Sequence, residues 1–439
     1  MTGRGTRDSV QTSIPSLKAG VCIVGAGPAG LMAAIHAAAG PLPVLVLETN
    51  ATAGRKLLLT GGGRCNFTHA GSPAEIAKAF EGLRGAENHA GGSVRPGRFL
   101  RHGLYEFSPD DVREFFHSRG LASTVEPDGC VFPVNNQAVD VRNLLTREAE
   151  RLGVHLLSQA RVSEIIAAGE GFIVRVQERR IPAARIILAT GGLSWPQTGS
   201  TGDGYRFAER LGHAIVPPKP ALVPLITRET WVSELAGVSL ADVEIRLPPD
   251  RRPVAAGNTL FTQRGIGGPA ILDLSRLLAD ALPDQQHGIP IEIDVFPEMD
   301  ESRMDRHLQE FLQAVARKAV ANALAEFMPR QFAQALCVLA GCGRDLPAGQ
   351  LTSEKRRQLV RTIKRLPLHV TAAEPIVKAT VTRGGVRRDE IDPRTMESKV
   401  HPGLFFAGEL IDLDGPCGGY NLQMCWSTGA LAGRSAARL

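Results

Sequence analysis

The feature that most constrains what this chain can fold into is a glycine-rich turn near its start, set between a strand and a helix. Residues 21–24 are apolar and partly β-branched, which is typical of a buried parallel strand. They lead into the GxGxxG run at 25–30, then into a helical stretch at 31–39 and a second apolar strand at 44–47 that ends at Glu48. Because these parts occur in this order over 28 residues, they predict a Rossmann-type βαβ unit that binds a dinucleotide.

Each part of this turn has a physical task. Gly25 permits the tight turn, Gly27 lets the backbone approach a pyrophosphate, and Gly30 lets the helix pack closely on the strand. The helix start offers unpaired N–H groups to phosphate, and the Glu48 carboxylate can accept hydrogen bonds from a ribose diol while it disfavours the 2′-phosphate of NADP. The predicted cofactor contacts of this unit are Gly25, Gly27, Pro28, Ala29, Gly30, Glu48 and Thr49.

A second glycine-rich stretch, residues 54–66, follows at the carboxyl edge of the predicted sheet, where ligands bind in such folds. Three consecutive glycines suit neither helix nor strand but fit backbone that lies flat against a planar ligand. Arg55 and Lys56, which precede these glycines, can reach phosphate. Arg64, which follows them, can stabilise an electron-rich ring edge. Cys65 is either a thiol that takes part in turnover or a small apolar filler. The predicted contacts here are Arg55, Lys56, Gly62, Gly63, Arg64, Cys65 and Asn66.

The far end of the chain carries a second cofactor signal. The strand at 185–188 ends in Ala-Thr-Gly-Gly, and the strand at 403–407 ends in Gly408-Glu409, whose carboxylate is placed for a ribityl hydroxyl. The turn Gly418-Gly419 starts a helix, with Asn421 as a cap-type residue, and a helix start aimed at the flavin N1–C2=O edge stabilises the reduced ring. NAD has no ring that needs this second cradle, so we predict FAD. The further predicted contacts are Val162 (to adenine), Ala189, Thr190, Gly191, Gly408, Glu409, Gly419, Asn421, Leu422 and Gln423.

These signals predict an α/β fold in which a discontinuous Rossmann-like FAD-binding domain is built from both ends of the chain. Between them, clustered prolines and short alternating segments predict an inserted β-rich, barrel-like domain, followed by a small helical subdomain. His307 lies on the expected apolar face of its first helix and is interpreted as structural. The predicted ranges are a disordered lead-in at 1–19, FAD-binding parts at 20–211 and 371–439, the β-rich insertion at 212–300 and the helical subdomain at 301–370.

Composition excludes several classes of protein. Fifty basic and 45 acidic residues leave a net charge of only +5, the charges are scattered along the sequence, and aromatic residues make up 5%, so no nucleic-acid partner is expected. The seven cysteines contain no CxxC pair, which argues against a zinc site and fits a reducing cytoplasm. The only long apolar stretch is interrupted by glycines and a proline, so no membrane span is expected.

The motifs GAGPAG, GGGRCN, ATGG, TGSTGDGY and GELIDLDGPCGGYNLQ occur in an order that resembles the bacterial aminoacetone-oxidase-like (BaiN-like) family of NAD(P)/FAD-dependent oxidoreductases. That family also includes a flavoprotein reductase of bile-acid intermediates. The resemblance covers the chain from about Val21 to its end. It implies FAD held by the glycine motif, the GGGRCN loop and the GGYNLQ segment, but it implies no one substrate. Cys417, Met424 and Cys425 depart from the commoner pattern at positions that border the flavin.

The sequence therefore predicts a cytoplasmic FAD-dependent oxidoreductase that acts on a small organic substrate. Electrons pass through the flavin either to oxygen, as in an amine oxidase that makes hydrogen peroxide, or from NAD(P)H, which would bind transiently because no second Rossmann turn is present. The alternatives are a tRNA-modifying or other nucleic-acid-acting flavoprotein, and a flavin sensor without turnover. No metal site is expected. The sequence does not indicate which oligomeric state the protein adopts.

Overall fold

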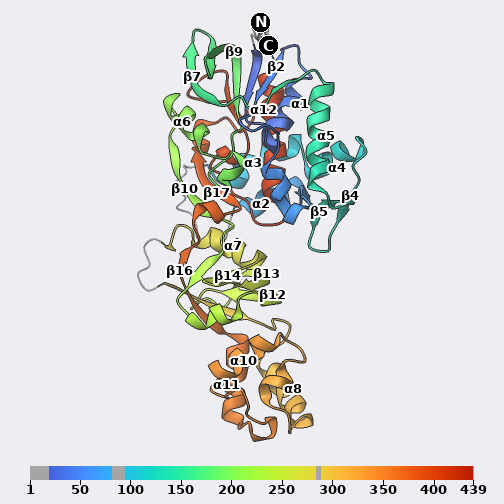
Figure 1. The fold of residues 1–439 in the computed structure, drawn as a ribbon, viewed down its shortest axis with the longest axis vertical. Helices are drawn as coiled ribbons and strands as arrows, with labels where there is room; N and C mark the ends of the chain where they lie inside the picture. The colour runs from blue at the N-terminus through green and yellow to red at the C-terminus, as the bar shows by residue number, and fades with distance from the viewer. Residues whose placement is uncertain (1–18, 82–93, 283–287, 439) are drawn as a thin grey trace, which may run out of the picture.

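The structure is a computed structural model that describes residues 19–81, 94–282 and 288–438. The predicted disordered lead-in lies, apart from Ala19, outside the described residues. The molecule is elongated, with a mixed α/β unit at one end, a barrel in the middle and a group of helices at the other end (Figure 1). Both chain termini lie at the α/β end (Figure 1). The predicted limits of the domains stay predictions, but the layers appear in the expected order along the chain.

A mainly parallel sheet forms the centre of the α/β unit, as the glycine-rich turn predicted. Its strands run in the spatial order β6-β2-β1-β9-β8-β7, and β18 also pairs with β9. Val21 of β1 faces Val44 of β2 on one side and Arg185 of β9 on the other, in parallel register. Fully buried β1 and β2 explain their unbroken apolar sequences. The strands are β1 (Ala19–Val24), β2 (Val44–Leu47), β6 (His155–Leu157), β7 (Val162–Ala168), β8 (Gly171–Val176), β9 (Arg179–Leu188) and β18 (Leu404–Phe406).

The two ends of the chain meet in the pair of helices α1 (Pro28–Ala37) and α12 (Tyr420–Ala436). These helices pack backbone to backbone at two glycines of α12. A Cβ atom on Gly429 would lie 2.4 Å from the carbonyl oxygen of Ala29, and one on Gly433 would lie 2.3 Å from that of Ala33. Neither distance leaves room for a side chain. The glycines of α12 therefore allow this helix to pack closely on α1.

The remaining helices of this unit cover the sheet and support the cofactor loops. Two of them begin with a serine capping box and a proline, which explains their sharp starts. A small antiparallel sheet of β3 (Thr68–His69), β5 (Cys130–Pro133) and β4 (Ser123–Val125) braces the glycine loop. The helices are α2 (Pro73–Phe80), α3 (Pro96–Glu106), α4 (Pro109–His117), α5 (Ala138–Arg151) and α6 (Asp203–Arg210).

The insertion is a closed six-stranded barrel, which confirms the barrel-like prediction. It is joined to the α/β unit by the antiparallel pair β10 (Ile215–Ala221) and β17 (Val381–Val386) and by helix α7 (Pro269–Leu278), which begins at a proline. The last barrel strand lies beyond the helical stretch, so the barrel takes strands from both sides of it. In spatial order the strands are β11 (Leu225–Thr227), β14 (Gly265–Gly267), β13 (Pro253–Phe261), β12 (Ser239–Arg246), β15 (Ile289–Asp294) and β16 (Leu366–Ala373).

The helical end contains α8 (Glu301–Ala314), α9 (Val320–Leu324), α10 (Arg330–Leu339) and α11 (Ser353–Lys364). The prediction of its first apolar face was partly wrong, because the residues that α8 buries are Met304, Leu308 and Leu312, whereas His307 is exposed. The predicted helical periodicity is confirmed, and His307 lies just outside the buried face. In the part of the chain that the structure describes, no helix is both long enough and apolar enough to cross a bilayer.

The packing of α12 on α1 gives a first prediction. Gly433→Leu should lower the free energy of unfolding by about 3 kcal/mol, the upper end of what overpacking costs, because the added side chain meets backbone that cannot move aside. Urea unfolding followed by circular dichroism measures the change. Ser435→Leu, which adds a comparable side chain to the half-buried face of the same helix, is the control. Equal stability of the two variants would contradict the close approach of the helices.

Candidate functional site

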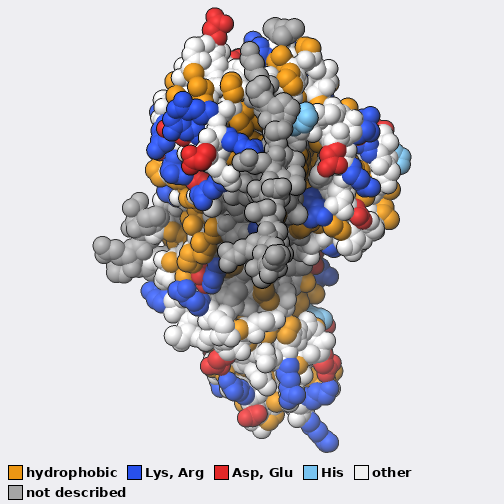
Figure 2. Space-filling view, turned by 45° about the horizontal axis from the view of Figure 1, so that its top comes forward, with side chains coloured by type: hydrophobic (Ala, Val, Ile, Leu, Met, Phe, Trp, Pro, Cys, Tyr) orange, Lys and Arg blue, Asp and Glu red, His pale blue; other side chains and the backbone are white. Residues whose placement is uncertain are grey.

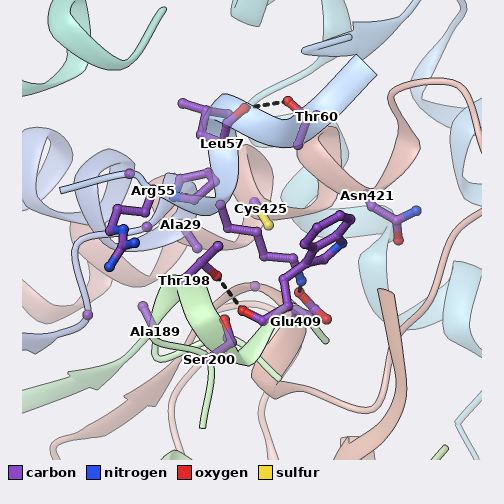
Figure 3. A pocket seen from close by; sticks show the side chains of 18 of the residues that line it. Ala29, Arg55, Leu57, Thr60, Ala189, Thr198, Ser200, Glu409, Asn421 and Cys425 are labelled. Carbon is purple, nitrogen blue, oxygen red and sulfur yellow. Dashed lines mark hydrogen bonds and ion pairs between the residues drawn. The ribbon is translucent and has the colours of Figure 1, made fainter. Parts of the chain in front are cut away.

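One cavity of about 420 Å³ opens at the carboxyl edge of the parallel sheet. The residues that follow β1, β2, β9 and β18 all line it, as expected for ligand binding in an open α/β sheet. Figure 3 shows residues from these distant segments around the cavity, among them Ala29, Ala189 and Glu409, with Arg55 and Asn421 at its edges. Most of the predicted cofactor residues line it: Gly25, Gly27, Pro28, Ala29, Glu48, Thr49, Arg55, Lys56, Gly62, Asn66, Val162, Ala189, Thr190, Gly191, Gly408, Glu409, Gly419, Asn421 and Leu422.

The N-terminus of α1 offers an anion site to this cavity. Gly27 is the N-cap residue, no side chain caps the helix, and no acidic residue lies in its first turn. The first N–H groups of the helix therefore keep their hydrogen-bonding capacity and the positive end of the helix dipole. A Cβ atom on Gly27 would meet no protein atom within 4 Å, so the space beside this glycine belongs to the cavity.

Glu48 sits at the end of the cavity where the sequence predicted a ribose. Its buried carboxylate accepts hydrogen bonds from the Ala26 backbone N–H (2.8 Å), the Asn50 backbone N–H (2.8 Å) and the Asn50 Nδ2 amide (2.7 Å). Three donors fix the side chain in place. Ala160 and Val162 line the same cavity, and the Ala160 N–H donates to the carbonyl of Glu48. This end is thus a fixed carboxylate beside a strand edge, which suits an adenosine.

Lys56 and Glu409 form a second polar cluster in the cavity, although they are 353 residues apart. The Lys56 Nζ ammonium lies 2.6 Å from Glu409 Oε2 and 2.6 Å from Ser194 Oγ. Glu409 Oε1 accepts from Ser194 Oγ at 2.9 Å and from the Thr382 N–H at 2.8 Å. Burial opposes ionisation of Glu409, but the Lys56 charge and these hydrogen bonds outweigh it and lower the pKa of the carboxyl. In this structure Arg55 donates to Asn50 and touches no anion.

The glycine loop after Lys56 is shaped by backbone that only glycine adopts easily. Gly61 and Gly62 have φ values of 57° and 65° and interrupt the 3₁₀ segment Lys56–Gly63. A Cβ on Gly62 would meet nothing within 4 Å, so this backbone faces open cavity. Asn66 lines the cavity and anchors the loop, because its Oδ1 accepts from the Val131 N–H at 3.2 Å.

The N-terminus of α12 faces the same cavity as that of α1. Gly418 and Gly419 have φ values of 109° and 95°, and α12 starts at the next residue without a side-chain cap. The prediction that Asn421 caps this helix was wrong. Its side chain instead accepts from the Gly415 N–H at 2.8 Å and donates to the Gly415 and Pro416 carbonyls, so it braces the preceding turn and leaves the helix start open.

Three predicted residues of the glycine loop do not line the cavity. Gly63 and Arg64 follow the point where the loop turns away, and Arg64 pairs with Glu126 at 2.7 Å and stacks on Phe132. Cys65 is fully buried and lies away from the cavity wall. Burial also raises the pKa of its thiol to about 12, so Cys65 is neither positioned nor ionised for turnover and we do not propose it as a catalytic group.

Two other predicted residues act from behind the cavity wall. A Cβ on Gly30 would lie 1.9 Å from the carbonyl oxygen of Gly25, so this glycine lets the helix approach the turn, as the sequence suggested. Gln423 is buried and accepts from Thr68 Oγ1 while it donates to the Phe107 carbonyl and to Ser427 Oγ. Both residues support the shape of the site and neither contributes to its lining.

Sequence reasoning missed the wall that the barrel side contributes. Leu222, beside β10, and Leu272, on α7, line the cavity, as does Trp195. Trp195 has φ 55° and ψ 56°, a conformation that is uncommon for a bulky residue and often marks a functional site. Trp195 lies between the ATGG and TGSTGDGY motifs and belongs to neither, and nothing in the sequence context of the two leucines distinguishes them from core residues.

The residues present fit FAD. Two uncapped helix starts suit a diphosphate and the electron-rich edge of a flavin, a fixed carboxylate suits a ribose, and two glycines leave space where a side chain would obstruct a ligand. FAD, when bound, supplies redox chemistry that no protein side chain offers. Within the described residues, no cluster of three or more His, Cys, Asp or Glu side chains is arranged to hold a metal ion.

Gly27 gives the sharpest test of this assignment. Because its Cβ position is open, Gly27→Val should fold normally but lose bound FAD, since the new side chain occupies the space of the diphosphate. The ratio of flavin absorbance to protein measures this. Cys65→Ala, which lies off the cavity wall, should keep the flavin. Full flavin content in Gly27→Val would contradict the diphosphate assignment.

Comparison with known proteins gives the same picture. Residues 19–435 match the family model described as the HI0933-like protein Rossmann domain. The chain is 34% identical to a 3-dehydro-bile acid delta(4,6)-reductase of Clostridium scindens, over 94% of this chain and 98% of that protein. It is 30% identical to a ribosomal RNA dihydrouridine synthase of Escherichia coli K12, over 92% of this chain and 95% of that protein. The solved structure of 3-ketosteroid-delta4-(5alpha)-dehydrogenase from Rhodococcus jostii RHA1 is similar in fold, with a TM-score of 0.50, 17% identity and 99% of both chains covered.

Proposed function

Because this chain belongs to the HI0933-like family of FAD-binding Rossmann oxidoreductases, we propose that it reduces a carbon–carbon double bond conjugated to a carbonyl group. The observation that carries the proposal is a protonated thiol, Cys417, in the wall of the FAD cavity. Reduction of such a bond needs one hydride and one proton. FAD, once reduced, supplies the hydride, and the chain must supply the proton.

The names of two relatives support this reaction class, although their substrates differ in size. A delta(4,6)-reductase of a 3-dehydro-bile acid removes ring double bonds conjugated with a 3-oxo group. A dihydrouridine synthase removes the double bond of uracil that is conjugated with a ring carbonyl. The shared step adds two electrons and two hydrogens across a polarised C=C bond. We therefore infer which type of bond is reduced, and experiment must identify the substrate molecule that contains it.

Cys417 is suited to donate the proton. Its backbone N–H donates to Asp273 Oδ1 at 2.7 Å, which fixes the turn just before α12, and the residue is only partly exposed. Burial, followed by the nearby Asp273 charge, raises the pKa of the thiol to about 11, so it stays protonated at neutral pH. When hydride reaches the carbon β to the carbonyl, the α carbon takes the thiol proton, and water then returns a proton to sulfur. Charge and atoms balance over these steps.

The barrel side of the cavity supports a substrate position next to the cofactor. Leu222 and Leu272 supply apolar wall on this side, so an unsaturated ring finds apolar contact there. Trp195, in the loop that follows β9, adds an aromatic side chain to the cavity lining. Polar groups gather instead around Glu48 and Glu409, where the cofactor's hydroxyls are expected. This division favours a planar, weakly polar reacting group. An amine oxidase, the other activity implied by the sequence resemblance, finds no carboxylate on the barrel side for a substrate ammonium among the lining residues that the structure describes.

We propose NAD(P)H as the electron donor, and the assay separates this from oxidase activity. Under anaerobic conditions, NADH or NADPH should bleach the flavin absorbance of the purified protein. Addition of a cyclic enone, a 3-oxo-Δ4 steroid or a uridine-containing RNA should then restore it, with the saturated product identified by mass spectrometry. Flavin that is reduced by an amine and reoxidised only by oxygen, with peroxide formed, would overturn the proposal.

The role of Cys417 can be tested in the same protein. Cys417→Ala should slow the substrate-dependent reoxidation of the flavin by about 100-fold, which is the typical contribution of a general acid. Flavin content and the rate of flavin reduction by NAD(P)H should not change, because neither step needs the proton. Cys337→Ala, a buried cysteine of the helical end, is the control. A variant that keeps the full rate of substrate reduction would remove Cys417 from the mechanism.

A further inference from the structure

We propose that a basic groove on the α/β unit holds the sugar–phosphate backbone of an RNA strand. The groove, called the α3 groove below, is lined by Arg98, Arg101, His102 and Tyr105 of α3 and by Arg394 and Lys399 of the segment before β18. The inference rests on the proposed function, since it makes RNA the carrier of the reducible ring. It extends that function by naming a surface outside the FAD cavity.

The spacing of the α3 residues places them on one helix face. Positions 98, 101, 102 and 105 follow the i, i+3, i+4, i+7 pattern, and all four side chains are exposed. The opposite face of α3 buries Phe99, Leu100, Gly103 and Leu104. The helix is therefore an apolar support on one side and a basic stripe about 10 Å long on the other.

The cations of the α3 groove lack acidic partners. Among the residues that the structure describes, no carboxylate lies within ion-pairing distance of Arg98, Arg101, Arg394 or Lys399, and no acidic residue lines the groove. Lys399 Nζ donates to the Asp389 backbone carbonyl at 2.8 Å. Cations gathered without counter-charges create a positive potential that attracts a polyanion.

Tyr105 gives the groove a second property that nucleic acids use. Its side chain is 55% exposed, an unusual state for a large aromatic residue, and the Arg101 guanidinium carbon lies 5.7 Å from its ring centre. An exposed ring beside cations is the arrangement on which single-stranded bases stack while their phosphates are neutralised. A free phosphate would leave this ring without a contact.

The groove is connected to the FAD cavity by Arg388. Its Nε donates to the carbonyl of Val94, at the start of the groove, at 3.1 Å, and its Nη1 binds Asp412. The chain continues from Asp412 to Cys417 in the cavity wall, and the ring of Phe80, at the end of α2, packs on Gly415 between them. Helices α2 and α3 lie side by side in the unit that contains the cavity (Figure 1). Arg388 thus joins the start of the groove to the segment that continues to Cys417.

The surface of the helical end differs from the α3 groove. There, acidic and basic side chains are mixed (Figure 2), and Arg356 of α11 pairs with Asp305 at 2.9 Å. Such a face is solvated rather than ligand-binding. The expectation of no nucleic-acid partner came from charges that are scattered along the sequence, and the fold gathers residues 98–102 and 394–399 into one place. Exposed Lys355 and Arg357 of α11 therefore supply a control of equal charge.

The test uses the FAD-loaded protein and a fluorescent, uridine-rich single-stranded RNA, with binding measured by anisotropy over a range of salt concentrations. Arg98→Ser with Arg101→Ser should weaken binding at least 10-fold and lower the slope of log K against log salt by about 1.4, because two phosphate contacts are lost. Tyr105→Ala should weaken binding about 10-fold. Lys355→Ser with Arg357→Ser should change neither value, and all variants should keep their flavin.

The outcomes separate this inference from the proposed function. If the groove variants bind RNA like the parent protein, or if heparin or anionic-lipid vesicles compete as well as RNA of the same charge, the α3 groove is not an RNA site. In that case, the proposed function would still be supported if the groove variants reduce a small cyclic enone at the rate of the parent protein. The protein could instead bind RNA through the α3 groove and yet reduce no conjugated C=C bond. That result would support the groove as an RNA site and contradict the proposed function.

Discussion

The contact on which this structure depends is the close packing of α12 on α1. Gly429 and Gly433 allow the last helix to touch the backbone of the first, so that residues some 400 positions apart in the sequence share one wall. Two consequences follow. The N-cap residues of the two helices, Gly27 and Gly419, line one cavity, and neither helix is capped by a side chain. Two positive helix ends directed at one space are stable only when something electron-rich lies between them or water solvates them, and a dinucleotide flavin meets that requirement over its whole length.

The barrel and the helix next to it complete the wall of this cavity. The barrel reaches the α/β unit through β10, β17 and α7, and α7 supplies both the apolar wall at Leu272 and the carboxylate of Asp273 that fixes the Cys417 turn. Polar groups therefore collect around Glu48 and Glu409, where we expect the cofactor, and Leu272 and Cys417 lie together on the side that faces α7. Relatives of this chain are named for a 3-dehydro-bile acid delta(4,6)-reductase and for a ribosomal RNA dihydrouridine synthase.

The sequence predicted the parts of the site that depend on backbone geometry. Glycines at 25, 27 and 62, the acid at the end of β2 and the Gly-Gly start of α12 each follow from a local requirement for space or positive φ, and each lies where expected. Side chains whose place depends on distant packing were harder to predict. Arg64 turns to Glu126 because a neighbouring loop offers a carboxylate, Asn421 braces a turn rather than a helix, and His307 is one residue off the buried face of α8. Leu222, Leu272 and the basic stripe of α3 become visible only once the barrel and the two ends of the chain are placed in space.

The central claim is that the two uncapped helix starts grip one flavin dinucleotide. An experimental structure of the protein with FAD bound tests it most directly. The account predicts the diphosphate against the backbone of Gly27 to Ala29 and the flavin ring against Gly419 to Asn421, with the adenosine ribose at Glu48. A structure in which FAD contacts only one of the two helix starts, or lies in another cavity, would contradict it.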